Sequence, residues 1–342
     1  KPMRRRWFLA ALMPLLLLAP RLAALAQESP FLTPPADNPF AALAARCQAL
    51  DLQQQNQDPD YLRYLAFYGL DQPGVQHFAG YVPSGSDQVF VHVFRPTGNT
   101  RGTVVTLHGY YVHTGLLVHL INRLLNADYT VVSVDLPGHG LSSGPRASIE
   151  EFGRYALALQ AVSERIRSLP GPFSLIGHST GGAGVWEYLL QQRTAMYAKA
   201  VLVAPLVRSA FWELSLAGFW LGQGWLQEIP RVVGPTSSDP SFFAMVRRDP
   251  LQYPGTPVQW VRALIQWNEH VIESYPPSNT PLLILQGTED TVVDWKFNLP
   301  FLQRKFLHTR VEILTGARHD LLWEAPAIRE QVFERILDFL NH

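Results

Sequence analysis

Cysteine is nearly absent from this chain of 342 residues. Cys47 is the single one, so no disulfide can form within the chain, and the fold must take its stability from buried apolar side chains. Hydrophobic residues make up 47% of the sequence, enough for one large core or two modest ones. No Cys/His spacing typical of a metal site occurs either, so we expect no bound metal.

Net charge is absent as well. Lysine and arginine together number 28, as do aspartate and glutamate, and no basic run occurs beyond the first residues. Nucleic-acid binding depends on concentrated positive charge, so this composition argues against a nucleic-acid partner.

The N-terminus lacks an apolar run long enough to span a membrane. The stretch Trp7–Ala19 falls short of the roughly 20 residues required, and Pro20-Arg21 follows it. A basic start, an apolar middle and a small-residue ending are instead typical of a secretory signal, which predicts a signal peptide over residues 1–26. Arg5-Arg6 also resembles a twin-arginine signal. We therefore expect an exported protein, periplasmic or secreted.

Short apolar runs alternate with stretches of helical spacing along most of the chain. An N-terminal extension over 27–74, with one predicted helix at 40–52, precedes two alternating segments joined by "SGSD", which predict a hairpin. The apolar runs are "TVVTLHG", "TVVSVDLPG", "FSLIGHS", "AVLVAPL", "PLLILQG" and "RVEILTG", and the predicted helices are 114–127, 149–168, 182–193 and 328–340. This alternation predicts an α/β fold with a mostly parallel sheet and flanking helices.

One interval interrupts the alternation. Residues 206–279 contain several of the nine tryptophans, and we predict that they form a cap inserted into a core made of 75–205 and 280–342. The stretch "FWELSLAGFWLGQGWLQEIP" is apolar nearly all round if helical. Such a segment predicts either an apolar wall for an acyl chain or a surface that contacts a membrane.

A serine between two glycines follows one of the predicted strands. The predicted strand "FSLIGHS" ends in Gly177-His178-Ser179, and Thr180-Gly181 then lead into a predicted helix. This order of strand, turn and helix is the context of a nucleophile elbow. The glycines suit such a turn because a side chain there would collide with its neighbours. Ser179 is therefore the candidate nucleophile.

A serine nucleophile needs a base and an acid that orients the base. Both are expected after Ser179, because the chain order in this kind of site is Ser, then Asp or Glu, then His. His319 follows "RVEILTG" and is the candidate base. Glu289, Asp290 and Asp294 all follow "PLLILQG"; Asp290 is favoured, because Asp294 suits the start of a helix.

Two backbone N–H groups are candidates for holding the negative oxygen that forms when a carbonyl is attacked. One belongs to Thr180, directly after the nucleophile. The other belongs to Tyr110, in the loop that follows "TVVTLHG".

These motifs together resemble the α/β-hydrolase fold, and within it the group of monoglyceride lipases, bacterial lysophospholipases and so-called serine aminopeptidases. "HGYYVHTG", "DLPGHGLSSGPR", "GHSTGG", "LLILQGTEDTVVD" and "GARHDLLWE" occur in the order found in that group, from about residue 75 to the C-terminus. The resemblance implies Ser179 as nucleophile, Asp290 as acid and His319 as base, with no cofactor. His108, His113, His139 and His178 are interpreted as packing or supporting residues.

The leading hypothesis is an exported serine hydrolase that cleaves carboxylic esters of monoacyl lipids, with peripheral membrane contact through the cap. The alternatives are a small-ester esterase, an aminopeptidase, an acyl transferase and, in another class, a non-catalytic binding protein on the same fold. An aminopeptidase needs an acidic pocket, for which the cap offers scattered carboxylates: Glu213, Glu228, Asp239, Asp249, Glu269 and Glu273.

Overall fold

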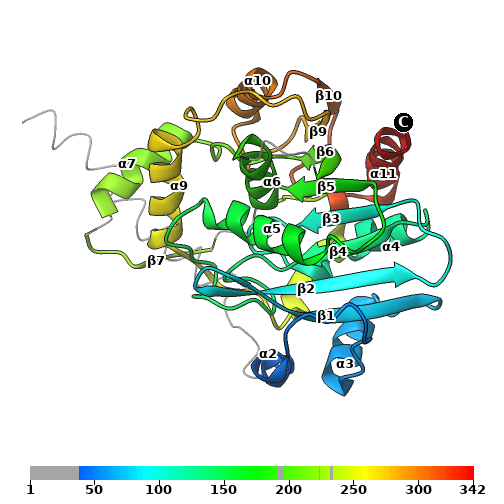
Figure 1. Ribbon diagram of the computed structural model, residues 1–342. Helices are drawn as coiled ribbons and strands as arrows, with labels where there is room; N and C mark the ends of the chain where they lie inside the picture. The colour runs from blue at the N-terminus through cyan, green and yellow to red at the C-terminus, as the bar shows by residue number, and fades with distance from the viewer. Residues whose placement is uncertain (1–37, 192–195, 223, 232–233) are drawn as a thin grey trace, which may run out of the picture.

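A twisted, mostly parallel sheet forms the centre of the molecule (Figure 1). The computed structural model describes residues 38–191, 196–222, 224–231 and 234–342, and within them the sheet has eight strands in the order β1-β2-β4-β3-β5-β6-β9-β10. The strands are β1 (Val75–Ser84), β2 (Asp87–Pro96), β3 (Thr103–Leu107), β4 (Thr130–Val134), β5 (Phe173–His178), β6 (Tyr197–Val203), β9 (Leu282–Gly287) and β10 (Thr309–Leu314). β2 runs antiparallel to both of its neighbours, and every other pairing is parallel.

Helices cover both faces of this sheet (Figure 1). One face packs against α5 (Arg154–Arg165), α6 (Thr180–Gln191) and α10 (Trp295–Lys305). The other packs against α4 (Val118–Leu125), α11 (Pro326–Asn341) and the short 3₁₀ helices η1 (Thr114–Leu117) and η2 (Leu321–Trp323). Most central strands are buried along their whole length, as expected for strands covered on both faces. β10, by contrast, lies at the edge of the sheet and is only partly buried.

The N-terminal extension contains a helix that the sequence pattern did not predict. α3 (Pro59–Tyr68) begins where the Asp58 side chain accepts a hydrogen bond from the Asp60 N–H, and it ends at Gly69, whose φ is 73°. It places tyrosine side chains in the core on the α4 face. The extension is therefore packed against the body rather than lying loosely over it.

The helix predicted over 40–52 is much shorter. α2 spans only Ala41–Arg46, because the chain beyond it extends alongside the edge strand β1. Leu50 N–H donates to the Tyr81 carbonyl at 2.9 Å, and Tyr81 N–H donates to the Gln48 carbonyl at 2.9 Å. Hydrogen bonds to the sheet edge replace those that a longer helix would have made, and they cover part of that edge.

The described residues of the interval predicted as a cap form five elements between β6 and β9. They are α7 (Trp212–Gly222), β7 (Glu228–Pro230), α8 (Pro240–Arg248), β8 (Gly255–Pro257) and α9 (Val258–His270), with β7 and β8 forming an antiparallel pair. α7, α9 and β7 lie together at one side of the molecule, on the left in Figure 1. The predicted signal peptide over 1–26 lies outside the described residues. No helix in the described ranges combines the length and apolar character of a membrane span.

Trp186 packs between the helices beside the sheet and α9, so we expect its removal to destabilise the protein. It is fully buried on α6, packs against Trp267 and Phe301, and donates from Nε1 to the Leu206 carbonyl at 3.1 Å. Trp186→Ala should lower the free energy of unfolding by about 3–5 kcal/mol. Trp220→Ala on α7, where the side chain is 60% exposed, is the matched control and should change it by less than about 0.5 kcal/mol. Urea unfolding followed by circular dichroism checks both values; equal losses would contradict the assignment.

Candidate active site

Ser179 lies in a sharp turn between β5, which ends at His178, and α6, which begins at Thr180. Its φ is 51°, in the left-handed region that a serine rarely adopts. A Cβ atom at Gly177 would lie 2.7 Å from the Gly181 carbonyl oxygen, and one at Gly181 would lie 2.4 Å from the carbonyl oxygens of Leu107 and His108. Both positions therefore require glycine, and the local structure is the elbow that the sequence motif predicted.

The three side chains predicted as nucleophile, base and acid lie in one hydrogen-bonded line. His319 Nε2 is 3.0 Å from Ser179 Oγ, and His319 Nδ1 is 2.8 Å from Asp290 Oδ2. All three residues are buried. Since Nδ1 donates to the carboxylate, Nε2 is free to accept the serine proton, which is the protonation state that a general base needs.

The structure separates the three acidic candidates by what they contact. Asp294 accepts the Phe297 N–H at the first turn of α10, so its carboxylate is a helix cap. The Glu289 side chain is more than half exposed, beside Arg318. Only Asp290 reaches His319, and the Val292 and Val293 N–H groups and the Gln286 side-chain amide hold its carboxylate in place.

The electrostatics of this line favour a charged acid and a basic imidazole. Burial by itself raises the pKa of Asp290, but the neighbouring His319 and the hydrogen bonds to the carboxylate outweigh it and lower this pKa to about 2. Burial likewise lowers the pKa of His319, and the Asp290 carboxylate outweighs it, so the net shift is upward from 6.5. The pair thus makes His319 a stronger base than a free imidazole.

The loop after β3 lies directly beside Ser179. A Cβ atom at Gly109 would be 3.2 Å from the Ser179 Cβ, so the backbone that leads to Tyr110 passes in contact with the elbow. Val112 N–H donates to the Gly109 carbonyl at 3.2 Å, which closes this loop into a turn, and Tyr111 has a left-handed φ of 62°. Thr180 is the first residue of α6, so its N–H has no partner within the helix. The two predicted backbone donors thus belong to segments that flank Ser179.

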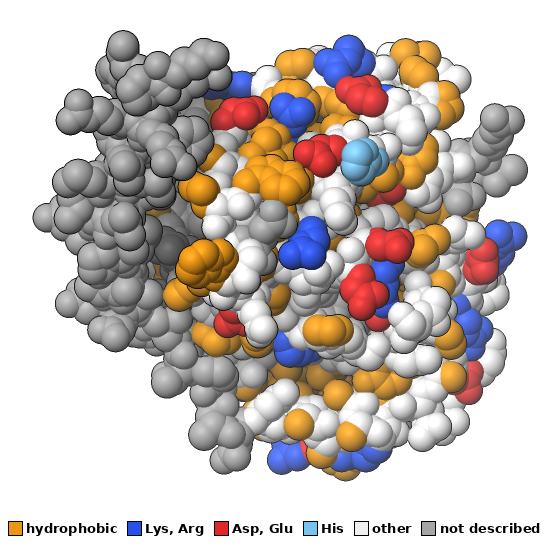
Figure 2. All heavy atoms as spheres, turned by 90° about the vertical axis from the view of Figure 1, so that its left-hand side faces the viewer, with side chains coloured by type: hydrophobic (Ala, Val, Ile, Leu, Met, Phe, Trp, Pro, Cys, Tyr) orange, Lys and Arg blue, Asp and Glu red, His pale blue; other side chains and the backbone are white. Residues whose placement is uncertain are grey.

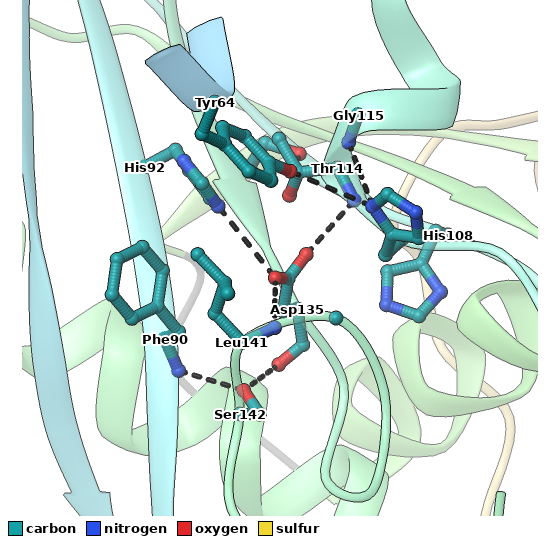
Figure 3. Close-up of polar contacts among 12 residues, drawn as sticks. Tyr64, Phe90, His92, His108, Thr114, Gly115, Asp135, Leu141 and Ser142 are labelled. Atoms are coloured by element: carbon teal, nitrogen blue, oxygen red, sulfur yellow. Dashed lines mark hydrogen bonds and ion pairs between the residues drawn. The ribbon is translucent and has the colours of Figure 1, made fainter. Parts of the chain in front are cut away.

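Asp135 anchors the segments around this loop, a role that the sequence pattern did not predict (Figure 3). Its buried carboxylate accepts the Thr114 N–H and the Leu141 N–H, both at 2.8 Å, and lies 3.6 Å from His92 Nε2. Its carbonyl accepts the Ser142 hydroxyl. Burial raises the pKa of Asp135, but the surrounding histidines outweigh it and keep this pKa well below its usual range. The signal available in the sequence was its place at the start of "DLPGHG".

The other histidines support the backbone around the site. His108 Nδ1 donates to the Gly109 carbonyl at 2.8 Å while its Nε2 accepts the Leu136 N–H at 2.8 Å. His178 Nε2 is 3.1 Å from the His319 carbonyl, so it holds the backbone of His319 in place. His139 Nδ1 donates to the Pro137 carbonyl and shapes its own turn. Burial lowers the pKa of His108 to about 4 and of His139 and His178 to about 3, so all three are neutral near pH 7.

No group of three or more His, Cys, Asp or Glu side chains within the described ranges is arranged to hold a metal ion.

Comparison with known proteins gives the family to which this chain belongs. The family model described as serine aminopeptidase, S33, matches residues 98–326, so the chain belongs to this hydrolase family. Human monoglyceride lipase is 29% identical over 269 residues, which cover 75% of this chain and 87% of that protein. Monoacylglycerol lipase from Mycolicibacterium smegmatis is 26% identical over 233 residues, covering 61% and 77%.

Solved structures agree on the fold. A soluble variant of monoglyceride lipase from Saccharomyces cerevisiae superposes with a TM-score of 0.65 at 19% identity, covering 77% of this chain and 94% of that one. Monoacylglycerol lipase from Paleococcus ferrophilus gives 0.63 at 22% identity, covering 74% and 98%. The predicted α/β-hydrolase fold, with its mostly parallel sheet, is confirmed, as is membership of the predicted group.

The Ser179–His319–Asp290 line predicts how the reactivity of Ser179 depends on pH. A fluorophosphonate should label Ser179, and because His319 must be neutral to accept the proton, the labelling rate should fall as pH is lowered through a midpoint above about 6.5. Asp290→Asn should reduce labelling at neutral pH by about 10³- to 10⁴-fold. Asp294→Asn, which removes a carboxylate charge but keeps the side-chain oxygen that caps α10, should leave both rate and midpoint unchanged. If the two variants had equal effects, Asp290 would not be the acid.

Proposed function

We propose that the protein is a serine hydrolase that cleaves the carboxylic ester of monoacyl lipids, such as monoacylglycerols or lysophospholipids, through an acyl-enzyme. The observation that carries this proposal is the Ser179–His319–Asp290 hydrogen-bonded line at a nucleophile elbow, in a chain of this hydrolase family. The family alone would not fix the chemistry, because one fold hosts many activities.

The chemistry follows from the contacts. Ser179 Oγ attacks the ester carbonyl while His319 Nε2 takes its proton, and Asp290 stabilises the imidazolium that forms. The N–H groups of Tyr110 and Thr180 stabilise the negative oxygen of the tetrahedral intermediate. His319 then gives the proton to the departing alcohol, which leaves an acyl-serine. A water molecule, activated by the same histidine, releases the fatty acid and restores the serine.

The apolar surface of the cap supports a lipid substrate. Large hydrophobic side chains gather on α7 and the residues beside it while facing solvent: Phe211, Leu214, Trp220, Leu221, Trp225, Leu226 and Ile229. Trp212 and Phe219 are the only buried residues of α7, so most of its apolar side chains lie outside the core. Relatives named monoglyceride lipase, monoacylglycerol lipase and phospholipase support the same substrate class.

An aminopeptidase, as the family's description suggests, has less support. It needs a carboxylate available to bind a substrate amine, and several acidic side chains of the cap are already engaged. Asp239 caps α8 and pairs with Arg329, Glu273 pairs with Arg304 and Lys305, and Asp249 is buried against His113. A binding protein on this fold has no need of a complete serine, histidine and aspartate set, which also ranks it lower.

Substrate preference tests the proposal. We expect the purified protein to hydrolyse a long-chain monoacylglycerol or the matching lysophospholipid faster than a short acyl ester, and to lose about 10⁵-fold or more of this activity in Ser179→Ala. Rates of fatty-acid release measure both. Cleavage of the short ester alone would reject the lipid assignment, and no cleavage together with no fluorophosphonate labelling would reject the enzyme.

Membrane contact through the cap is the second part of the proposal. Figure 2 views the side of the molecule that carries α7, where hydrophobic side chains lie at the surface among charged ones. Trp220 and Trp225 are 60% and 89% exposed, and indole rings favour the boundary between water and lipid. The signal-like N-terminus supports an exported enzyme as part of the same proposal.

Vesicle binding checks the membrane contact. The double variant Trp220→Ser/Trp225→Ser should bind phosphatidylcholine vesicles at least about tenfold more weakly in co-sedimentation, because it loses two apolar side chains. Leu157→Ser, on α5 and 48% exposed, is the control and should bind as the unaltered protein does. Equal binding by all three proteins would refute contact through α7.

A further inference from the structure

Asp249 is a buried carboxylate outside the Ser179–His319–Asp290 line, and the proposed chemistry does not use it. Asp249 follows α8 in the interval between β6 and β9, and its side chain is completely buried. A buried carboxylate is costly unless hydrogen bonds replace the water it loses. Its partners therefore identify what this side chain holds together.

Those partners come from three separate parts of the chain. The Tyr68 hydroxyl, from α3 of the N-terminal extension, donates to Asp249 Oδ1 at 2.6 Å. His113, from the loop after β3, lies with Nε2 2.9 Å from Oδ2. The third part is local, where the Leu251 N–H and the Gln252 side-chain amide donate at 3.0 and 2.7 Å.

The nitrogen of His113 that carries the hydrogen can be identified from the contact of its other nitrogen. His113 Nδ1 accepts the Gly115 N–H at 3.1 Å, so Nε2 carries the hydrogen and donates it to Asp249. Burial raises the pKa of Asp249, but His113 and the other donors outweigh it, so this pKa lies below its usual value. The carboxylate is thus ionised near pH 7 and accepts four hydrogen bonds, which leaves it no need for solvent.

Asp249 acts on the site through Gln252 and Tyr111. The Gln252 side-chain amide that it orients also donates to the Tyr111 carbonyl at 3.0 Å. The Tyr111 hydroxyl donates to the Gly255 carbonyl at 3.1 Å and contacts Thr256, so the segment 249–256 holds both the backbone and the side chain of Tyr111. Tyr111 has the left-handed φ of 62°, a conformation that persists only where the surroundings impose it.

The same loop is held at its far end by Asp135. Thr114, next to His113, donates its N–H to the Asp135 carboxylate at 2.8 Å (Figure 3). Gly115 lies so close to the Tyr68 ring that a Cβ atom there would come within 2.6 Å of it. The loop between β3 and η1, which includes the Tyr110 N–H, is therefore fixed from two sides, and α3 forms part of one of them.

We propose that Asp249 is a positioning residue for the Tyr110 N–H, and that Tyr68 makes the N-terminal extension a working part of the active site by holding Asp249. This inference rests on the proposed function. It assigns to α3, which lies outside the residues matched by the family model, a role in stabilising the negative oxygen of the reaction.

Two variants and a control test it. Tyr68→Phe keeps the ring that packs on Gly115 and removes only the hydroxyl. Asp249→Asn keeps the shape but puts an NH₂ group opposite one set of donors. Tyr197→Phe is the matched control. Tyr197 is also buried, and its hydroxyl contacts Ser163 at 2.6 Å. It lies at the start of β6, whereas the turn at Ser179 contacts the other end of that strand.

The readouts separate positioning from stability. On a soluble short-chain ester, kcat should fall about 10- to 100-fold in Asp249→Asn and about 3- to 10-fold in Tyr68→Phe, with KM changed less than about twofold. The Kd of a trifluoromethyl ketone, which forms the same oxyanion with Ser179, should rise by the factor by which kcat/KM falls. The double variant should resemble Asp249→Asn alone, because Tyr68 acts through Asp249. Tyr197→Phe should lower Tm without changing kcat.

Each outcome decides the matter. If Tyr68→Phe keeps kcat and inhibitor Kd within about twofold of the unaltered protein, the proposal is wrong, and this variant decides alone should Asp249→Asn not fold. If Tyr197→Phe loses as much kcat as Tyr68→Phe, the effect is general destabilisation and the proposal is again overturned. If the unaltered protein neither cleaves esters nor reacts with a fluorophosphonate, the proposed function itself fails, and the role of Asp249 fails with it.

Discussion

The close approach of two backbones at the nucleophile elbow is the constraint on which the rest of the site depends. Gly177 and Gly181 let β5, α6 and the loop after β3 meet at distances that no side chain permits, and Ser179 takes a strained conformation as a result. The sheet imposes this meeting, because parallel strands bring the loops at their carboxyl ends to one edge. For the same reason His319 reaches the serine from the loop after β10, and Asp290 reaches His319 from the loop after β9.

Buried carboxylates arranged around this elbow share one pattern. Asp290, Asp135 and Asp249 each accept at least one backbone N–H and lie beside a histidine. A buried charge of this kind fixes the loops that supply its donors, because moving any one of them would leave the carboxylate unpaired. His319, the loop after β3 and the segment after α8 are thus each held by a buried carboxylate that accepts their hydrogen bonds.

The sequence predicted the parts of the site that follow from strand order. Ser179, Asp290 and His319 each come directly after an apolar run, and the elbow motif carries its own local signal. Asp249 gave no such signal, because it stood among scattered acidic and aromatic residues and its partner Tyr68 is 181 positions away. Tertiary contacts of that range leave no periodicity in the sequence.

The N-terminal extension was predicted least well. α3 has ends that the sequence signals, since Asp58-Pro59 starts it and Gly69 stops it, but the sequence pattern predicted no helix there. The helix predicted over 40–52 was too long, because pairing of 48–50 with β1 is a tertiary effect that overrides local helix preference. In both cases packing against the sheet decided the outcome.

The separation between Tyr68 and Asp249 also sets an order of events during synthesis. The tyrosine leaves the ribosome 181 residues before the aspartate, an interval of about 10 to 40 s at common elongation rates. Through that interval α3 lacks the carboxylate that its hydroxyl binds in the finished protein. α3 therefore completes its contacts only after the segment that follows α8 has been synthesised, so a helix made early in the chain depends on residues made much later.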